Sequence, residues 1–105
     1  HAMTERTASL DLDLISEIRR ALAVPLVLHG SSGVPDQVIQ AGIEAGLTKI
    51  NVSTYLNTQF TAAIHEFFDA NPNVVDSRKY LGAGRNALRD GAANLLRLFA
   101  LKERA

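Results

Sequence analysis

The amino-acid sequence predicts an α/β fold, predominantly helical by content, in which two short strands alternate with helices. Two short apolar runs bounded by proline or glycine, residues 25–29 and 47–52, are typical of buried strands. Around them, apolar residues recur at the spacing of amphipathic helices. Strands that alternate with helices normally pair in parallel, so these two runs are expected to be neighbours in one sheet.

The first two expected helices carry clear start and stop signals. Residues from about 12 to 22 are predicted to be helical, with Ser9 or Asp11 as the amino-terminal cap. Pro35 is well placed to open the next helix, and Gly46 to end it.

Two longer helical stretches follow the second strand. Ser53 or Thr54 is expected to cap the first of them, and Asn71 with Pro72 closes it. A last stretch is expected to start at Asp76 or Ser77. The glycines expected to weaken or interrupt this stretch are Gly82, Gly84 and Gly91.

The chain is too short for a finished parallel fold. A complete (β/α)8 TIM barrel takes about 250 residues, so this sequence corresponds to a partial barrel of two βα units plus carboxy-terminal helices. Missing neighbours would leave strand edges unpaired, which predicts self-association, most simply as a homo-oligomer. Residues 1–3 resemble a cloning scar, which leaves 4–105 as the barrel fragment.

Composition excludes several classes of function. Eleven basic residues balance eleven acidic ones, so bulk charge recruits neither nucleic acid nor an anionic membrane. No apolar run approaches the ~18 residues of a membrane span. The sequence has no cysteine, which excludes disulfides and thiolate chemistry and fits a cytoplasmic location.

Polar side chains end both predicted strands. Because side chains alternate along a strand, His29 and Asn51 are expected on one face at neighbouring carboxyl ends, where barrel enzymes keep their active sites. His29 can be a metal ligand or a satisfied structural histidine. Asn51 can satisfy nearby backbone or donate to a substrate oxygen. His65 falls beside the apolar stripe of its helix and is expected to face solvent.

The loops after the two strands have the composition of a phosphate site. Residues 30–33 read Gly-Ser-Ser-Gly, and Ser53-Thr54 stands at a helix start. Small residues let backbone N–H groups approach an anion, hydroxyls add donors, and a helix amino terminus adds a favourable dipole. A plain turn remains the other interpretation of Gly-Ser-Ser-Gly.

Two motifs in this order resemble a known family. Residues 25–35, Pro-Leu-Val-Leu-His-Gly-Ser-Ser-Gly-Val-Pro, followed by residues 46–54, Gly-Leu-Thr-Lys-Ile-Asn-Val-Ser-Thr, resemble the last two barrel strands of class II fructose- and tagatose-bisphosphate aldolases. Residues 76–82 resemble the segment after the last barrel helix of that family. The resemblance implies reversible aldol cleavage of a ketose bisphosphate to dihydroxyacetone phosphate and an aldehyde, with Zn²⁺ as the cofactor.

The resemblance also implies roles for individual residues. His29 would be one of three zinc-ligating histidines, and Asn51 would contact the carbonyl or enediolate oxygen of the substrate. Arg78 would reach the second phosphate. Lys49 matches a family position without an assigned step. The residues implied to hold the phosphate of dihydroxyacetone phosphate are Gly30, Ser32, Ser53 and Thr54.

The sequence also departs from the family pattern. The other two zinc histidines and the catalytic aspartate have no counterpart here, and Asp36, Asp69 and Asp76 stand where capping is expected. We therefore expect weak or no zinc binding and no activity from this chain alone. Two alternatives stay open: a self-associating phosphate-binding module without enzymatic function, and a fragment of another phosphate-binding barrel enzyme, such as a sugar-phosphate isomerase. Assignment to a sugar-phosphate isomerase would not explain why a histidine directly precedes Gly30.

Overall fold

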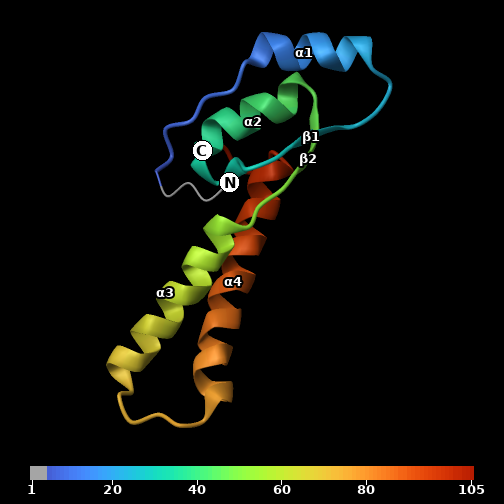
Figure 1. The fold of residues 1–105 in the computed structure, drawn as a ribbon. Helices are drawn as coiled ribbons and strands as arrows, with labels where there is room; N and C mark the ends of the chain where they lie inside the picture. The colour runs from blue at the N-terminus through green and yellow to red at the C-terminus, as the bar shows by residue number, and fades with distance from the viewer. Residues whose placement is uncertain (1–4) are drawn as a thin grey trace.

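A computed structural model describes residues 5–105, which form a small α/β head and a projecting pair of long helices (Figure 1). The predicted cloning scar lies outside these residues. The described part measures 58 × 23 × 23 Å. Its radius of gyration is 16.9 Å, against about 13 Å for a globular domain of this length. Along the chain the elements are α1 (Leu12–Ala21), β1 (Leu26–Leu28), the 3-10 turn η1 (Ser31–Gly33), α2 (Asp36–Ala45), β2 (Leu47–Ile50), α3 (Thr54–Ala70) and α4 (Ser77–Phe99).

The predicted parallel pair is confirmed, although both strands are shorter than expected. β1 pairs with β2 through Leu26 with Leu47 and Leu28 with Ile50, and the register is irregular directly after Leu26. The last contact of the ladder is the Asn51 N–H, which donates to the Leu28 carbonyl at 3.0 Å. His29 and Asn51 therefore lie just beyond the paired residues, at the carboxyl ends of the two strands.

The helices of the head begin and end where the sequence signals predicted. The Asp11 carboxylate accepts the Leu14 N–H at 3.0 Å and caps α1. Pro35 directly precedes α2, and Gly46 ends it with a φ of 139°, a conformation that favours glycine. The turn at Gly46 leads straight into β2, so α2 carries the chain back to a parallel strand.

The two long helices pack side by side, and α4 is continuous from Ser77 to Phe99 (Figure 1). The prediction that its glycines interrupt the helix is wrong, because two of them face α3. A Cβ on Gly84 would lie 2.7 Å from the Phe60 ring, and one on Gly91 would meet the Gln59 side-chain oxygen. These positions let the helices approach closely, which compensates for the low helix propensity of glycine.

Few side chains are buried, and they join the head to the end of α4. Within the described residues, the buried apolar side chains are Val34, Ile39, Leu47, Leu95 and Leu98. Gln40 is also buried, and its amide donates to the carbonyls of Leu98 and Glu103 at 3.1 and 2.5 Å. The carboxy-terminal turn is thereby fixed against α2.

The side of the head formed by α1 and β1 is open and apolar. Leu14, Val24 and Val27 are 48%, 57% and 41% exposed, well above what a core residue shows. Leu14 and Val27 line a groove of about 310 Å³ between α1 and the sheet, together with Leu10, Ile15 and Ile18. This surface lies beside the strand that pairs on one side only, as expected for a piece of a larger sheet.

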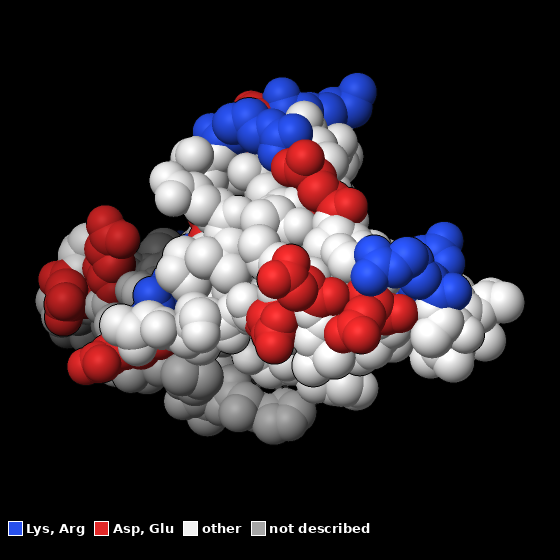
Figure 2. Space-filling view, turned by 90° about the horizontal axis from the view of Figure 1, so that it is seen from above, with Lys and Arg blue, Asp and Glu red and all other residues white. Residues whose placement is uncertain are grey.

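Charged side chains of both signs are interspersed over the upper face of the molecule. Figure 2 shows basic groups at the top and right of this face, each next to acidic groups, further acidic groups at the left, and uncharged surface between them. This distribution agrees with the equal numbers of acidic and basic residues. None of the helices in residues 5–105 combines the length and the apolar character that crossing a membrane requires.

Candidate active site

Two loops meet at the carboxyl edge of the sheet and enclose a hollow of about 240 Å³. One loop follows β1 and contains η1, and the other joins β2 to α3. The structure brings together five of the residues named from the sequence and adds two more. The hollow is lined by Gly30, Ser31, Ser32, Asn51, Val52, Ser53 and Thr54.

Two buried serine hydroxyls bind the loops to each other. Ser31 Oγ donates to the Asn51 carbonyl at 2.6 Å, and Ser32 Oγ accepts the Tyr55 N–H at 3.1 Å. Ser31 is 3% exposed and Ser32 8% exposed, so both serines are largely buried and both bonds are partly buried. The loops consequently form one unit, although 20 residues of sequence separate them.

The Ser32 bond changes the predicted capping of α3. Ser53 is the residue before the helix, as expected, but its side chain makes no capping hydrogen bond. The hydroxyl that satisfies the second helical N–H, that of Tyr55, comes from Ser32 in the other loop. Sequence reasoning missed this cap because capping signals are sought among chain neighbours, whereas Ser32 lies 23 residues earlier.

Gly30 makes the sharp turn between β1 and η1. Its φ and ψ are 62° and 46°, in the left-handed region that side chains with a Cβ disfavour. This turn brings Ser31 to the Asn51 carbonyl, directly after β2, and Ser32 to the first turn of α3. Glycine at position 30 is thus explained by backbone conformation as well as by access to the hollow.

His29, Asn51 and Lys49 form a chain of polar contacts beside the hollow. The Asn51 Nδ2 atom lies 3.1 Å from His29 Nδ1, and Lys49 Nζ donates to Asn51 Oδ1 at 2.8 Å. The predicted proximity of His29 and Asn51 is therefore what the structure shows. The contact with Lys49 was not foreseen.

Electrostatics at the hollow favour an anion. It opens at the amino terminus of α3, a helix of 17 residues whose dipole places partial positive charge there. The lining has hydroxyl and amide groups and no carboxylate. The arrangement suits a phosphate-sized anion held by neutral donors.

Arg78 lies away from these residues. It stands in the first turn of α4, at the end of the hairpin opposite the hollow (Figure 1). With 17 residues at about 1.5 Å each, α3 alone separates the two places by about 25 Å. The Arg78 guanidinium forms an ion pair with Asp76 at 2.8 Å. The structure does not bring Arg78 to the site of its own chain.

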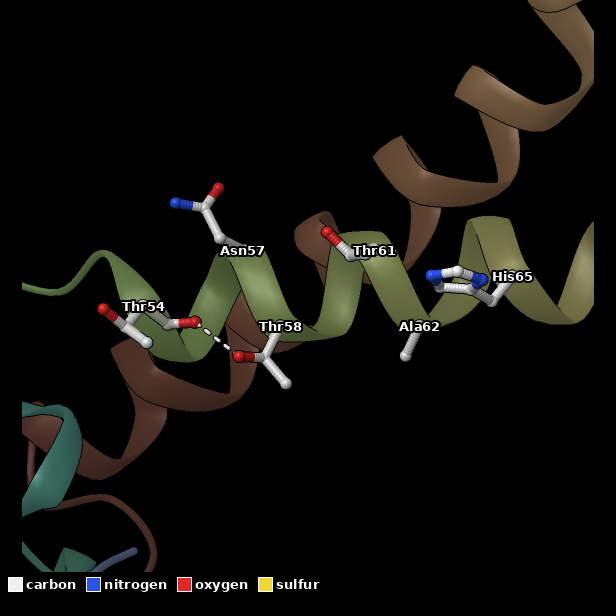
Figure 3. Close-up of a pocket in the computed structure, with 6 residues that line it drawn as sticks. All are labelled: Thr54, Asn57, Thr58, Thr61, Ala62 and His65. Atoms are coloured by element: carbon white, nitrogen blue, oxygen red, sulfur yellow. Dashed lines mark hydrogen bonds between the residues drawn. The ribbon is translucent and has the colours of Figure 1, made fainter. Parts of the chain in front are cut away.

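His65 lies on the outer face of α3, exposed to solvent as predicted. Figure 3 shows it at one end of a row of short side chains that begins at Thr54 and includes Asn57 and Thr61. In this row Thr58 Oγ1 donates to the Thr54 carbonyl at 2.8 Å. The row borders a broad, open depression and holds no second histidine or carboxylate.

The residues present do not fit a complete zinc centre. Among residues 5–105 no three histidine, cysteine, aspartate or glutamate side chains gather in a group that would hold a metal ion. A catalytic zinc takes three protein ligands. His29 can therefore supply at most one of them.

Parallel βα units with polar residues at the carboxyl ends of their strands are the architecture of a barrel enzyme. A family model described as fructose-bisphosphate aldolase class-II matches residues 1–104. The chain belongs to the class II fructose-bisphosphate aldolase family. The sequence resemblance on which that family was predicted is thereby confirmed.

A solved structure shares this fold. The X-ray crystal structure of the YdjI aldolase from Escherichia coli K12 matches with a TM-score of 0.78 and 31% sequence identity. The match covers 93% of this chain and 36% of that one. The chain thus spans about a third of the length of that aldolase and corresponds to part of a (β/α)8 barrel.

Proposed function

We propose that this chain forms the phosphate-binding corner of a ketose-bisphosphate aldolase. The observation that supports this most directly is the hollow between the two serine-linked loops, at the amino terminus of α3 and next to His29 and Asn51. A phosphate held by Gly30, Ser32, Ser53 and Thr54 would place the adjoining carbons of dihydroxyacetone phosphate near Asn51. The reaction class is reversible aldol cleavage.

Asn51 would act on the substrate oxygen. Its amide lies at the edge of the hollow and can donate to a carbonyl or enediolate oxygen, where negative charge develops during cleavage. Proton transfer needs an acid–base group that no residue of this chain is proposed to supply. The chain alone is therefore proposed to bind and to be inactive.

We propose His29 as one zinc ligand of a larger centre. A single histidine binds zinc weakly, so the chain alone is expected to hold no stoichiometric zinc at micromolar protein after dialysis, as measured by metal analysis. Stoichiometric zinc bound by the wild-type chain would contradict the proposal that the chain contributes a single ligand. Zinc that is bound equally by wild type and His29→Ala would overturn the assignment of His29, with His65→Ala as the control.

Arg78 is proposed to contact the second phosphate only from another copy of the chain. The length of α3 separates it from the hollow of its own chain, and its side chain is 89% exposed. This proposal accords with a homo-oligomer.

Titration with inorganic phosphate tests the phosphate site. In ¹H–¹⁵N spectra we expect phosphate to shift the amides of Gly30, Ser32 and Thr54, and Thr54→Val to weaken binding at least about threefold through loss of one hydroxyl. Thr61→Val, on the exposed face of the same helix, is the matched control. Unchanged spectra with phosphate would rule out the site.

Dihydroxyacetone phosphate distinguishes an aldolase corner from a general anion site. We expect it to bind more tightly than phosphate and to shift the Asn51 side-chain amide as well. Equal affinities, with no shift at Asn51, would favour the phosphate-binding module without enzymatic function.

A further inference from the structure

Lys49 lies on the same strand face as Asn51, two residues before it, but it does not line the hollow. Its ammonium donates to Asn51 Oδ1 at 2.8 Å. Lys49 therefore reaches a ligand in the hollow only through Asn51.

The backbone of Asn51 is fixed on both sides. Its N–H donates to the Leu28 carbonyl at 3.0 Å, and its own carbonyl accepts Ser31 Oγ at 2.6 Å. Since the main chain is held, the remaining freedom of Asn51 lies in its side chain. The choice that matters there is which end of the amide, oxygen or NH₂, faces His29.

We infer that Lys49 is a positioning residue that makes this choice. An ammonium group can only donate hydrogen bonds, so it selects the amide oxygen and turns the NH₂ group toward His29 Nδ1, 3.1 Å away. In the metal-free chain one N–H of the amide meets the imidazole nitrogen, which a zinc-bound His29 could not offer as an acceptor. The other is presented to the hollow that Asn51 lines.

The positive charge of Lys49 also strengthens the donor that it positions. Withdrawal of electron density from the amide oxygen makes the amide N–H groups better donors, as in other cooperative hydrogen-bond chains. If the proposed function holds, Lys49 raises the affinity for a phosphorylated α-hydroxyketone, because the oxygen of that ligand contacts Asn51. The affinity for inorganic phosphate, held at the other end of the hollow, is not raised.

The positioning itself is tested without any ligand. In ¹⁵N-labelled protein we expect a scalar coupling across the hydrogen bond between Asn51 Nδ2 and His29 Nδ1. Lys49→Met should abolish the coupling and Lys49→Arg should retain it. Lys102→Met, in the carboxy-terminal turn, controls for the loss of a lysine. A coupling that persists in Lys49→Met would overturn the inference.

Binding measurements separate positioning from direct contact. We expect Lys49→Met to weaken the binding of dihydroxyacetone phosphate about fivefold. The affinity for inorganic phosphate should be unchanged. In an Asn51→Ala background the same substitution should have no further effect. Weaker phosphate binding, or additive losses in the double variant, would mean that Lys49 contacts the ligand itself and would refute the inference.

The two proposals fail in different ways. If wild-type protein binds neither ligand, the proposed function falls, while the coupling experiment still decides the role of Lys49. If both ligands bind but Lys49→Met changes nothing, the inference falls and the phosphate site stands.

Discussion

Asp76 and Arg78 form a local unit at the start of α4. The Asp76 carboxylate accepts the Arg78 backbone N–H at 3.0 Å and pairs with the same residue's guanidinium. The Arg78 side chain first, and its backbone N–H second, lower the pKa of Asp76 below its ordinary value of 3.8. Both contacts are at the surface, so a substitution at Asp76 tests the start of α4 without changing the buried core.

The lowered pKa predicts a pH dependence of stability. A carboxyl group whose pKa is lower in the folded protein stabilises it above the unfolded value, and this stabilisation is lost as the pH falls through the folded pKa. We expect Asp76→Asn to reduce the free energy of unfolding at neutral pH, and the difference from wild type to shrink below about pH 3.8. Urea unfolding at several pH values measures it.

Asp90→Asn is the control, because Asp90 pairs with Arg89 on the exposed side of the same helix at 3.2 Å. We expect little change in stability from it at any pH. A difference between Asp76→Asn and wild type that grows toward acid would contradict the assignment.

Two glycines of α4 should respond in opposite ways to the same substitution. A Cβ on Gly84 would lie 2.7 Å from the Phe60 ring, whereas one on Gly82 would meet nothing within 4 Å. We expect Gly84→Ala to destabilise by about 1–3 kcal/mol through overpacking. Gly82→Ala should stabilise by about 0.5–1 kcal/mol through helix propensity.

Thermal or urea unfolding of the two variants gives both values. Stabilisation by Gly84→Ala would show that the Phe60 ring moves aside at little cost, and that α3 and α4 are less closely packed than described.

At the scale of elements, Ser32 makes the start of α3 depend on the loop after β1. We expect Ser32→Ala to cost about 1 kcal/mol, the usual effect of losing a helix cap, and to speed hydrogen exchange at the Tyr55 amide. Ser53→Ala should cost much less, since its hydroxyl makes no capping bond. Urea unfolding gives the loss of stability in each variant. An equal or larger loss in Ser53→Ala would contradict a cap supplied by Ser32.

The elements and the meeting of the two loops could be predicted from the sequence because the signals are local. Caps at Asp11 and Asp76 and the stop at Gly46 are read from neighbouring residues, and parallel strands must end at one edge. The roles of Ser31 and Lys49 depend on contacts that form only once that edge exists. The glycines of α4 were misjudged because propensity carries no information about the ring of Phe60.

At the scale of the whole molecule, the open side of the head predicts self-association. β1 has one partner strand, and the apolar surface beside it includes Leu14 and Val24. We expect light scattering after size-exclusion chromatography to give a mass that rises with protein concentration. Val27→Lys, a charge on the strand edge, should lower that mass.

Val75→Lys is the matched control, because Val75 is 91% exposed at the far end of the hairpin. A monomer at all concentrations, or an equal effect of the two variants, would contradict association through the β1 edge.

The cytoplasmic location expected from the sequence stays a prediction.

The Ser32 hydroxyl, which accepts from the Tyr55 N–H, joins two events that are usually separate. The first turn of α3 and the hollow need the same bond, so local unfolding of that turn also dissolves the binding site. By thermodynamic linkage, an anion bound in the hollow should slow hydrogen exchange along the start of the hairpin. Substitutions that destabilise the hairpin should in turn weaken the binding of the anion. The affinity of the hollow for an anion thus reports on how stably the start of α3, in the projecting hairpin, is folded.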